Sequence, residues 1–225
     1  MAEAVIASHA CATTSLVTVS AVAGVVGPIL FAITLTALSY LCPGYNPLTQ
    51  TISELGATNA PTMELQALNF AILGVPTAIF AIGLGVYNRH FRSTSILVGL
   101  YGIGTLLVAG LPCDPGCSFK GTSLVQIAHS LDALFSFVVF AFAPLFFWRS
   151  SRTAPTWTKT PAWSLRVAIL SILMLVSYLA ITALALSSTA GLVQRIFLGL
   201  LFAWMIMIAY KMARLATIDS GHSFP

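Results

Sequence analysis

The chain of 225 residues is 58% hydrophobic and only 7% charged, and its mean hydropathy is +0.94. A soluble domain carries about 25% charged residues, so a chain with 10 Lys and Arg and 6 Asp and Glu cannot cover a water-facing surface. The composition excludes a soluble globular domain, a disordered chain and a small disulfide-rich secreted domain, and it leaves an integral membrane protein.

Six stretches of the chain are long and apolar enough to cross about 30 Å of hydrocarbon as helices. They are continuous runs rich in Leu, Ala, Ile and Phe, without the strict alternation of β-barrel strands. We therefore predict a single membrane domain, 1–225, that is an all-α bundle of six transmembrane helices with no β-sheet. The predicted spans are 17–41, 65–87, 93–112, 122–148, 165–187 and 190–211.

The Lys and Arg residues predict how these helices are oriented. Eight of them lie on one side of the predicted membrane and two on the other. The larger group is Arg89, Arg92, Arg149, Arg152, Lys159, Arg166, Lys211 and Arg214, and the smaller is Lys120 and Arg195. Because short cytoplasmic loops carry the excess of positive charge, we expect both termini in the cytoplasm, at an inner or plasma membrane, and loops 42–64 and 112–121 outside. No basic patch interleaved with aromatic residues is present, so nucleic acid is not an expected partner.

The first outer loop contains the sequence Thr51-Ile52-Ser53-Glu54-Leu55-Gly56, which predicts one short helix. A surface loop is the favoured interpretation of this region, and a re-entrant segment is the alternative. In the same way, Glu54 is either part of a polar lid, as loops are normally polar, or a carboxylate that points into the mouth of the bundle. The second possibility makes Glu54 a candidate catalytic residue.

The second outer loop contains Pro112-Cys113-Asp114-Pro115-Gly116-Cys117. Two cysteines four positions apart around a Pro-Gly turn can form a small disulfide in an oxidising compartment, so Cys113 and Cys117 are disulfide candidates. Free thiols, or a pairing with Cys42 on the same side, are the alternatives. Asp114 is a candidate ligand-binding residue.

The fourth predicted helix carries a polar stripe. Thr122, Gln126, His129, Asp132 and Ser136 follow at intervals of four, three, three and four, so they share one face. Ionisable residues within a membrane span face protein or water. We therefore take His129 and Asp132 as candidate catalytic residues and Gln126 as a candidate ligand-binding residue; polar contacts that join two helices are the alternative role.

Arg195 is the remaining candidate ligand-binding residue. The apolar run from Ile196 to Tyr210 is too short to cross the membrane at 1.5 Å per residue, so the sixth helix must begin near Ala190 and carry Arg195 inside the bilayer boundary. The arginine either extends to the outer headgroups or forms an ion pair with Asp132 or with an anionic headgroup.

The sequence indicates no cofactor and no metal site. It contains no CxxC pair, no HxxxH motif and no phosphate-binding glycine loop. A haem held between helices would need paired histidines within the spans, and only His129 is clearly embedded.

These residues resemble a family of membrane proteins catalogued as domain of unknown function 998. The resemblance lies in the order of Ser53-Glu54-Leu55-Gly56, Pro112-Cys113-Asp114, His129 and Arg195, and it extends from about Gly24 to Tyr210. It implies six helices but no reaction. More distantly, a polar loop after the first helix followed by Pro61 and Glu64 is similar to the autophagy-modulator and GPI-lipid-remodelling membrane proteins, which hints at lipids.

Three functions are compatible with these features. The leading hypothesis is that the protein binds or handles a membrane lipid or another hydrophobic small molecule in a polar pocket open to the outer leaflet. The second is an intramembrane acid–base enzyme, resembling a terpene cyclase or a lipid hydrolase, in which a buried carboxyl donates a proton. The third is a proton-coupled transporter, against which six spans without a visible repeat argue unless the protein forms a homodimer.

Overall fold

The computed structural model describes residues 2–118, 121, 123–157, 161–184 and 187–221. It contains six α-helices: α1 (Ala2–Leu41), α2 (Met63–Tyr87), α3 (Arg92–Ala109), α4 (Leu124–Ser151), α5 (Pro161–Ala183) and α6 (Ala190–Gly221). Four short 3-10 helices lie between them: η1 (Ile52–Gly56), η2 (Arg89–Phe91), η3 (Pro155–Trp157) and η4 (Ser187–Thr189). No strand occurs in these residues, so the predicted all-α fold is confirmed.

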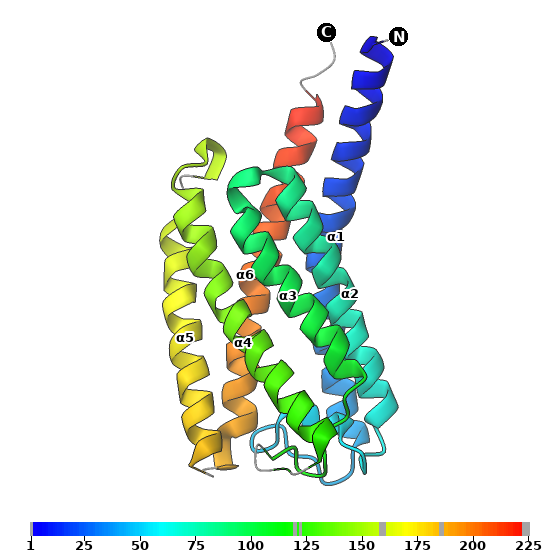
Figure 1. The fold of residues 1–225 in the computed structure, drawn as a ribbon, viewed down its shortest axis with the longest axis vertical. Coiled ribbons are helices and arrows are strands. Elements are labelled where there is room, and N and C mark those ends of the chain that lie inside the picture. Colours follow the sequence, from blue (N-terminus) through cyan, green and yellow to red (C-terminus); the bar gives the residue numbers. More distant parts are fainter. Residues whose placement is uncertain (1, 119–120, 122, 158–160, 185–186, 222–225) are drawn as a thin grey trace.

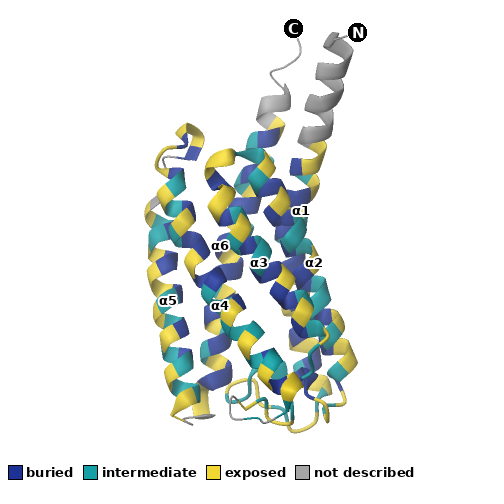
Figure 2. Ribbon diagram, viewed as in Figure 1, coloured by how far each residue is buried: buried dark blue, intermediate teal, exposed yellow. Residues whose placement is uncertain are grey.

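All six α-helices include a segment long and apolar enough to cross a membrane. The segments are Ser15–Leu41, Met63–Tyr87, Arg89–Ala109, Leu124–Ser151, Ala162–Ala183 and Ala190–Thr217. Large apolar side chains such as Ile33, Ile82, Leu131 and Val176 are exposed on the outer faces of the bundle (Figure 2). An apolar outer surface is what lipid contact requires, so the chain is an integral multi-pass membrane protein.

The helices form a closed ring in chain order, in which α6 returns to pack against α1. Both termini lie at one end of the bundle (Figure 1), which we call the terminal end. The opposite end, where η1, η4 and residues 110–118 lie, we call the loop end.

Glycines let α2 and α3 approach closely. A Cβ added at Gly74 would lie 2.8 Å from the carbonyl oxygen of Gly102, and one added at Gly102 would lie 2.8 Å from the amide nitrogen of Ala78. Small residues at such contacts are the usual way in which membrane helices gain van der Waals packing, because lipid gives no hydrophobic driving force between them.

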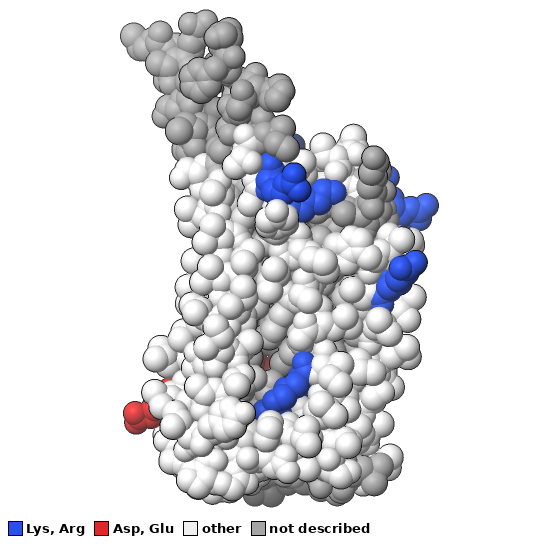
Figure 3. Space-filling view, turned by 180° about the vertical axis from the view of Figure 1, so that it is seen from behind, with Lys and Arg blue, Asp and Glu red and all other residues white. Residues whose placement is uncertain are grey.

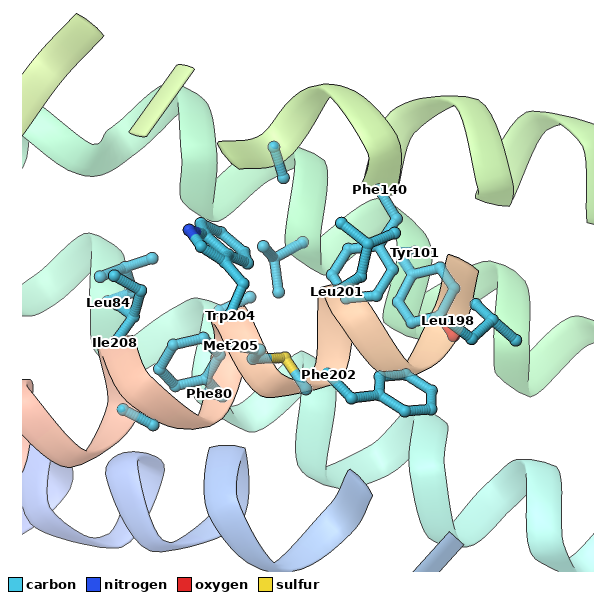
Figure 4. Close-up of a cluster of buried hydrophobic side chains, with 14 of the residues drawn as sticks. Phe80, Leu84, Tyr101, Phe140, Leu198, Leu201, Phe202, Trp204, Met205 and Ile208 are labelled. Carbon is cyan, nitrogen blue, oxygen red and sulfur yellow. The ribbon is translucent and has the colours of Figure 1, made fainter. Parts of the chain in front are cut away.

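A cluster of large buried side chains, among them Phe80, Tyr101, Phe140, Phe202 and Trp204, lies inside the bundle (Figure 4). The rings of Tyr101 and Phe140 are stacked with their centroids 3.9 Å apart, and Phe147 meets Trp204 edge to face at 5.8 Å. Trp157 of η3 is fully buried beneath the terminal end. These ring contacts pack α3, α4 and α6 against one another.

Candidate functional site

The loop end contains a buried segment. Ile52, Leu55 and Ala57 are at most 3% exposed, so η1 packs into the end of the bundle and does not lie wholly on its surface. The apolar pair at positions 52 and 55 stands three residues apart, which places both on the inner side of one helical turn. Burying these side chains stabilises a segment that is otherwise too polar to be inside.

Hydrogen bonds fix η1 in this position. The Ile52 backbone N–H donates to Oε1 of Gln194 on α6 at 2.8 Å, and the Thr62 hydroxyl donates to the Leu55 carbonyl at 2.7 Å. The Thr58 N–H donates to the Cys113 carbonyl at 2.9 Å. Three separate parts of the chain therefore hold η1.

Glu54 stabilises the start of η1. Its Oε1 accepts from the backbone N–H of Thr51 at 2.7 Å and from the Thr51 hydroxyl at 3.2 Å, and its Oε2 accepts from Nε2 of Gln50 at 2.8 Å. Both carboxylate oxygens thus have partners within the loop, an arrangement that caps a helical turn. Glu54 lines none of the cavities described below.

Arg195 is bonded to the first loop rather than to Asp132. Its guanidinium donates to the carbonyl oxygens of Pro47 and Gln50, at 2.8 and 3.1 Å, and also to the Tyr45 hydroxyl. The Tyr45 hydroxyl donates in turn to the Thr51 carbonyl at 2.8 Å. Burial raises the pKa of the Tyr45 phenol above its usual value of 10, although the adjacent Arg195 acts in the opposite direction. No carboxylate of the described residues pairs with this guanidinium, so its positive charge is held in place by neutral oxygens.

A groove runs along the outside of the bundle between α1 and α6, and we call it the α1–α6 groove. Its volume is about 450 Å³. Its walls are mainly apolar and include Phe31 and Leu35 on α1 and Leu198 and Phe202 on α6, and Arg195 closes its loop end together with Tyr45. Figure 3 shows this face of the molecule. One basic side chain (blue) lies beside a hollow, and a small part of an acidic side chain (red) is visible deep inside that hollow.

Behind the groove lies a small inner cavity of about 40 Å³, which shares Phe31, Ile52 and Leu198 with the groove as walls. Asp132 lines it, and Oδ2 of Asp132 is buried without a hydrogen-bond partner in the described part of the chain. The Ser136 hydroxyl, one turn further along α4, is in the same situation. The inner cavity is much smaller than the groove.

His129, Gln126 and Asp114 hold the second loop against α4. Nδ1 of His129 lies 2.7 Å from the Leu111 carbonyl; because a carbonyl only accepts, Nδ1 is assigned the proton. The Asp114 N–H donates to Oε1 of Gln126 at 2.8 Å, and the Ser123 hydroxyl donates to Oδ1 of Asp114 at 2.8 Å. Asp114 and Gln126 line neither the groove nor the inner cavity, whereas His129 lines two further cavities beside η1.

Cys113 and Cys117 form a disulfide with their Cα atoms 5.2 Å apart. Cys42 is free. The sulfur of Cys113 lies 3.4 Å from the Ser53 carbonyl oxygen, so the bridged loop packs directly on η1.

The structure therefore separates the predicted site residues. Asp132 lies in the inner cavity, Arg195 on the groove, His129 beside η1, and Glu54, Asp114 and Gln126 in loop networks. The predicted Thr122 and two of the counted basic residues, Lys120 and Lys159, lie outside the described residues. Among the described residues no group of three His, Cys, Asp or Glu side chains is arranged to hold a metal ion.

Sequence reasoning missed Tyr45, Gln194 and Gly199, which contribute to the groove or hold η1. Tyr45 and Gln194 had a signal, because each is a polar side chain next to a predicted site element. Gly199 had none, since a glycine in an apolar helix says nothing about the groove that it opens.

Comparison with known proteins identifies a matching family but indicates no activity. The family model described as "Protein of unknown function (DUF998)" matches residues 25–211. No curated protein and no solved structure matches the chain. The distant likeness to autophagy-modulator and GPI-lipid-remodelling proteins thus stays a prediction.

Proposed function

Because the chain belongs to the DUF998 family, whose description assigns no activity, we propose its function from the site itself: it binds an amphipathic lipid with an anionic head in the α1–α6 groove. The observation that carries this proposal is a largely apolar groove with a fixed arginine at one end.

Size and chemistry support a lipid as the ligand. Pockets for small molecules usually have volumes of about 300–1,000 Å³ and apolar walls with a few polar groups, and the groove has about 450 Å³. An acyl or polyprenyl chain would lie against Phe31 and Phe202, and the anionic head would meet Arg195. Since no carboxylate neutralises Arg195 within the described chain, its positive charge would attract an incoming anion, and the guanidinium N–H groups not used by the first loop could bind it.

We also propose that the loop end faces the outside of an inner or plasma membrane. The basic residues gather at the terminal end, which is typical of the cytoplasmic side (Figure 3). The Cys113–Cys117 bridge at the loop end supports the same orientation, because disulfides persist in oxidising compartments. In this orientation the groove is open to the outer leaflet.

A groove-filling variant tests lipid binding. A Cβ added at Gly199 would meet no atom within 4 Å, and Gly199 lines the groove. Because a side chain can start here without a contact, Gly199→Phe is expected to place its ring in the groove. We expect native mass spectrometry of gently extracted protein to detect a retained lipid on the wild type and none on the variant.

The matched control is Ile196→Phe, which changes an exposed apolar side chain on the same helix outside the groove. We expect it to retain lipid like the wild type. Equal lipid retention by all three proteins would contradict binding in the groove.

A second candidate function, an acid–base step on the bound lipid, is favoured by one observation: the unpartnered Oδ2 of Asp132 lies in a cavity that shares walls with the groove. In that function, Asp132 would donate a proton to the part of the lipid that reaches Ile52. Asp132→Asn should then keep lipid retention and abolish conversion of the lipid.

A further inference from the structure

A second hollow lies at the terminal end, far along the bundle from the α1–α6 groove. It lies where η2 and the first turn of α3 meet the last turns of α4, and its volume is about 680 Å³. Its lining is rich in side chains with nitrogen or hydroxyl donors, among them His90, Ser93, Arg149 and Arg152. We call this hollow the terminal basin.

The lining of the basin is positively charged, and no acidic side chain in it offsets that charge. Arg149 in the last turn of α4 and Arg152, the C-cap residue of that helix, stand three positions apart, so they share a face, and both are exposed. The guanidinium of Arg152 lies 5.3 Å from the centre of the Trp148 ring, a cation–π contact that orients it.

Basic residues at the end of a helix have an ordinary explanation, since they complement the helix dipole. That explanation covers Arg149 and Arg152 on α4. It does not cover His90 and Ser93, which come from η2 and α3 and face the same hollow. Donors from two separate elements around one concave surface are instead typical of an anion site.

The walls of the basin indicate which anion it receives. Phe146 is 40% exposed and lines the basin together with Trp148, so one side of the hollow is aromatic. Aromatic residues lie at the level of lipid headgroups in membrane proteins, and arginine binds phosphate through two parallel hydrogen bonds. A free phosphate ion would use the donors but leave the aromatic side in water.

We propose that the terminal basin binds the phosphate of an anionic phospholipid headgroup through Arg149 and Arg152, while Phe146 and Trp148 contact the adjoining glycerol and acyl region. This site is independent of the α1–α6 groove and of the lipid proposed there. It would select lipids of the leaflet that surrounds the terminal end.

Lipid titration of the full chain tests the basin. Purified protein in mild detergent is titrated with phosphatidylglycerol or with phosphatidylcholine, and bound lipid is measured by native mass spectrometry. We expect the wild type to prefer phosphatidylglycerol and the pair Arg149→Gln and Arg152→Gln to weaken its binding about 30-fold, since each basic residue near an anionic headgroup contributes about fivefold. Each single variant, which keeps most of the surface charge, is expected to weaken binding about fivefold.

The control is the pair Arg166→Gln and Arg214→Gln, which removes the same charge from exposed arginines that do not line the basin. We expect it to bind phosphatidylglycerol like the wild type. An equal loss in this pair would mean that charge in general attracts the lipid, and unchanged binding in the Arg149 and Arg152 variants would overturn the proposal directly.

Inorganic phosphate distinguishes the two sources of the anion. We expect millimolar phosphate to leave phosphatidylglycerol bound to the wild type, because phosphate gains nothing from the aromatic side of the basin. Displacement of the lipid by phosphate would show a site for the free ion and would overturn the lipid headgroup as its ligand.

Discussion

At the scale of single residues, Asp132 and Arg195 have opposite surroundings. Arg195 donates to several oxygens of the first loop and of its own helix, whereas Oδ2 of Asp132 has no partner in the described chain. Sequence spacing predicts that both are embedded, but it cannot tell that carbonyls almost 150 positions earlier in the chain bind the arginine. The ion pair with Asp132, one of the alternatives for Arg195, is not formed.

Removing the unpartnered carboxyl should stabilise the protein. A buried polar group without a partner costs about 1–3 kcal/mol, so Asp132→Val is expected to raise the free energy of unfolding by about that amount. The measurement is thermal or denaturant unfolding in detergent. Such a gain on removing a polar residue is typical of positions kept for function.

Thr105→Val is the control for that experiment. Thr105 lines the same inner cavity, but its hydroxyl donates to the Tyr101 carbonyl at 2.8 Å. We expect Thr105→Val to lower stability by about 0.5–1.5 kcal/mol. If Asp132→Val is as destabilising as Thr105→Val, the carboxyl has a partner and the premise of the acid–base function is wrong.

Tyr45 is expected to make the stability of the protein depend on pH. Its folded pKa is raised by burial above the value near 10 of the unfolded chain. The folded state therefore binds the phenol proton more tightly than the unfolded state does. The resulting contribution of Tyr45 to the free energy of unfolding is complete below pH about 10 and is lost as pH rises through the folded pKa. We expect urea unfolding of the wild type to show this loss of stability at alkaline pH. If Tyr45→Phe does not show the loss, the loss is due to the Tyr45 phenol. The same loss in both proteins would exclude Tyr45 as the cause.

At the scale of secondary-structure elements, hydropathy predicts the transmembrane helices because each must be apolar over its full membrane crossing. The motif at 51–56 correctly predicts the short helix η1, but hydropathy does not predict that η1 is buried, for a physical reason. A short polar segment can enter a bundle only when other elements satisfy its backbone, and the partner of Ile52 is Gln194 on the last helix. The candidate site depends on such long-range contacts, so the sequence identifies most of its residue types but not their grouping.

The burial of η1 predicts different effects of two leucine-to-alanine substitutions on stability. Leu55 is fully buried and Leu48 in the same loop is 54% exposed. Leu55→Ala should lower the free energy of unfolding by about 2–5 kcal/mol through lost transfer energy and an added cavity, and Leu48→Ala should change it by less than about 0.5 kcal/mol. Similar small effects of both changes in thermal unfolding would mean that η1 lies on the surface.

At the scale of the whole molecule, the ring of helices places two different ends on opposite sides of one membrane. The loop end has η1, the disulfide and the mouth of the α1–α6 groove, and the terminal end has the terminal basin and most of the basic residues. The proposed lipids would thus enter from different leaflets. This arrangement depends on the orientation of the bundle, which accessibility to a membrane-impermeant reagent can determine.

Cysteine labelling tests the orientation in intact cells. Asn59→Cys places a thiol at an exposed position of the loop end, and Thr156→Cys places one at an exposed position of η3 at the terminal end. Each is made after Cys11 and Cys42 are replaced by serine, while the Cys113–Cys117 bridge is kept. Because the excess of Lys and Arg predicts a cytoplasmic terminal end, we expect an impermeant maleimide to label Asn59→Cys in intact cells and Thr156→Cys only after permeabilisation. The reverse pattern would place the groove in the cytoplasmic leaflet and the basin outside, while labelling of both thiols in intact cells would contradict a membrane-spanning bundle between them.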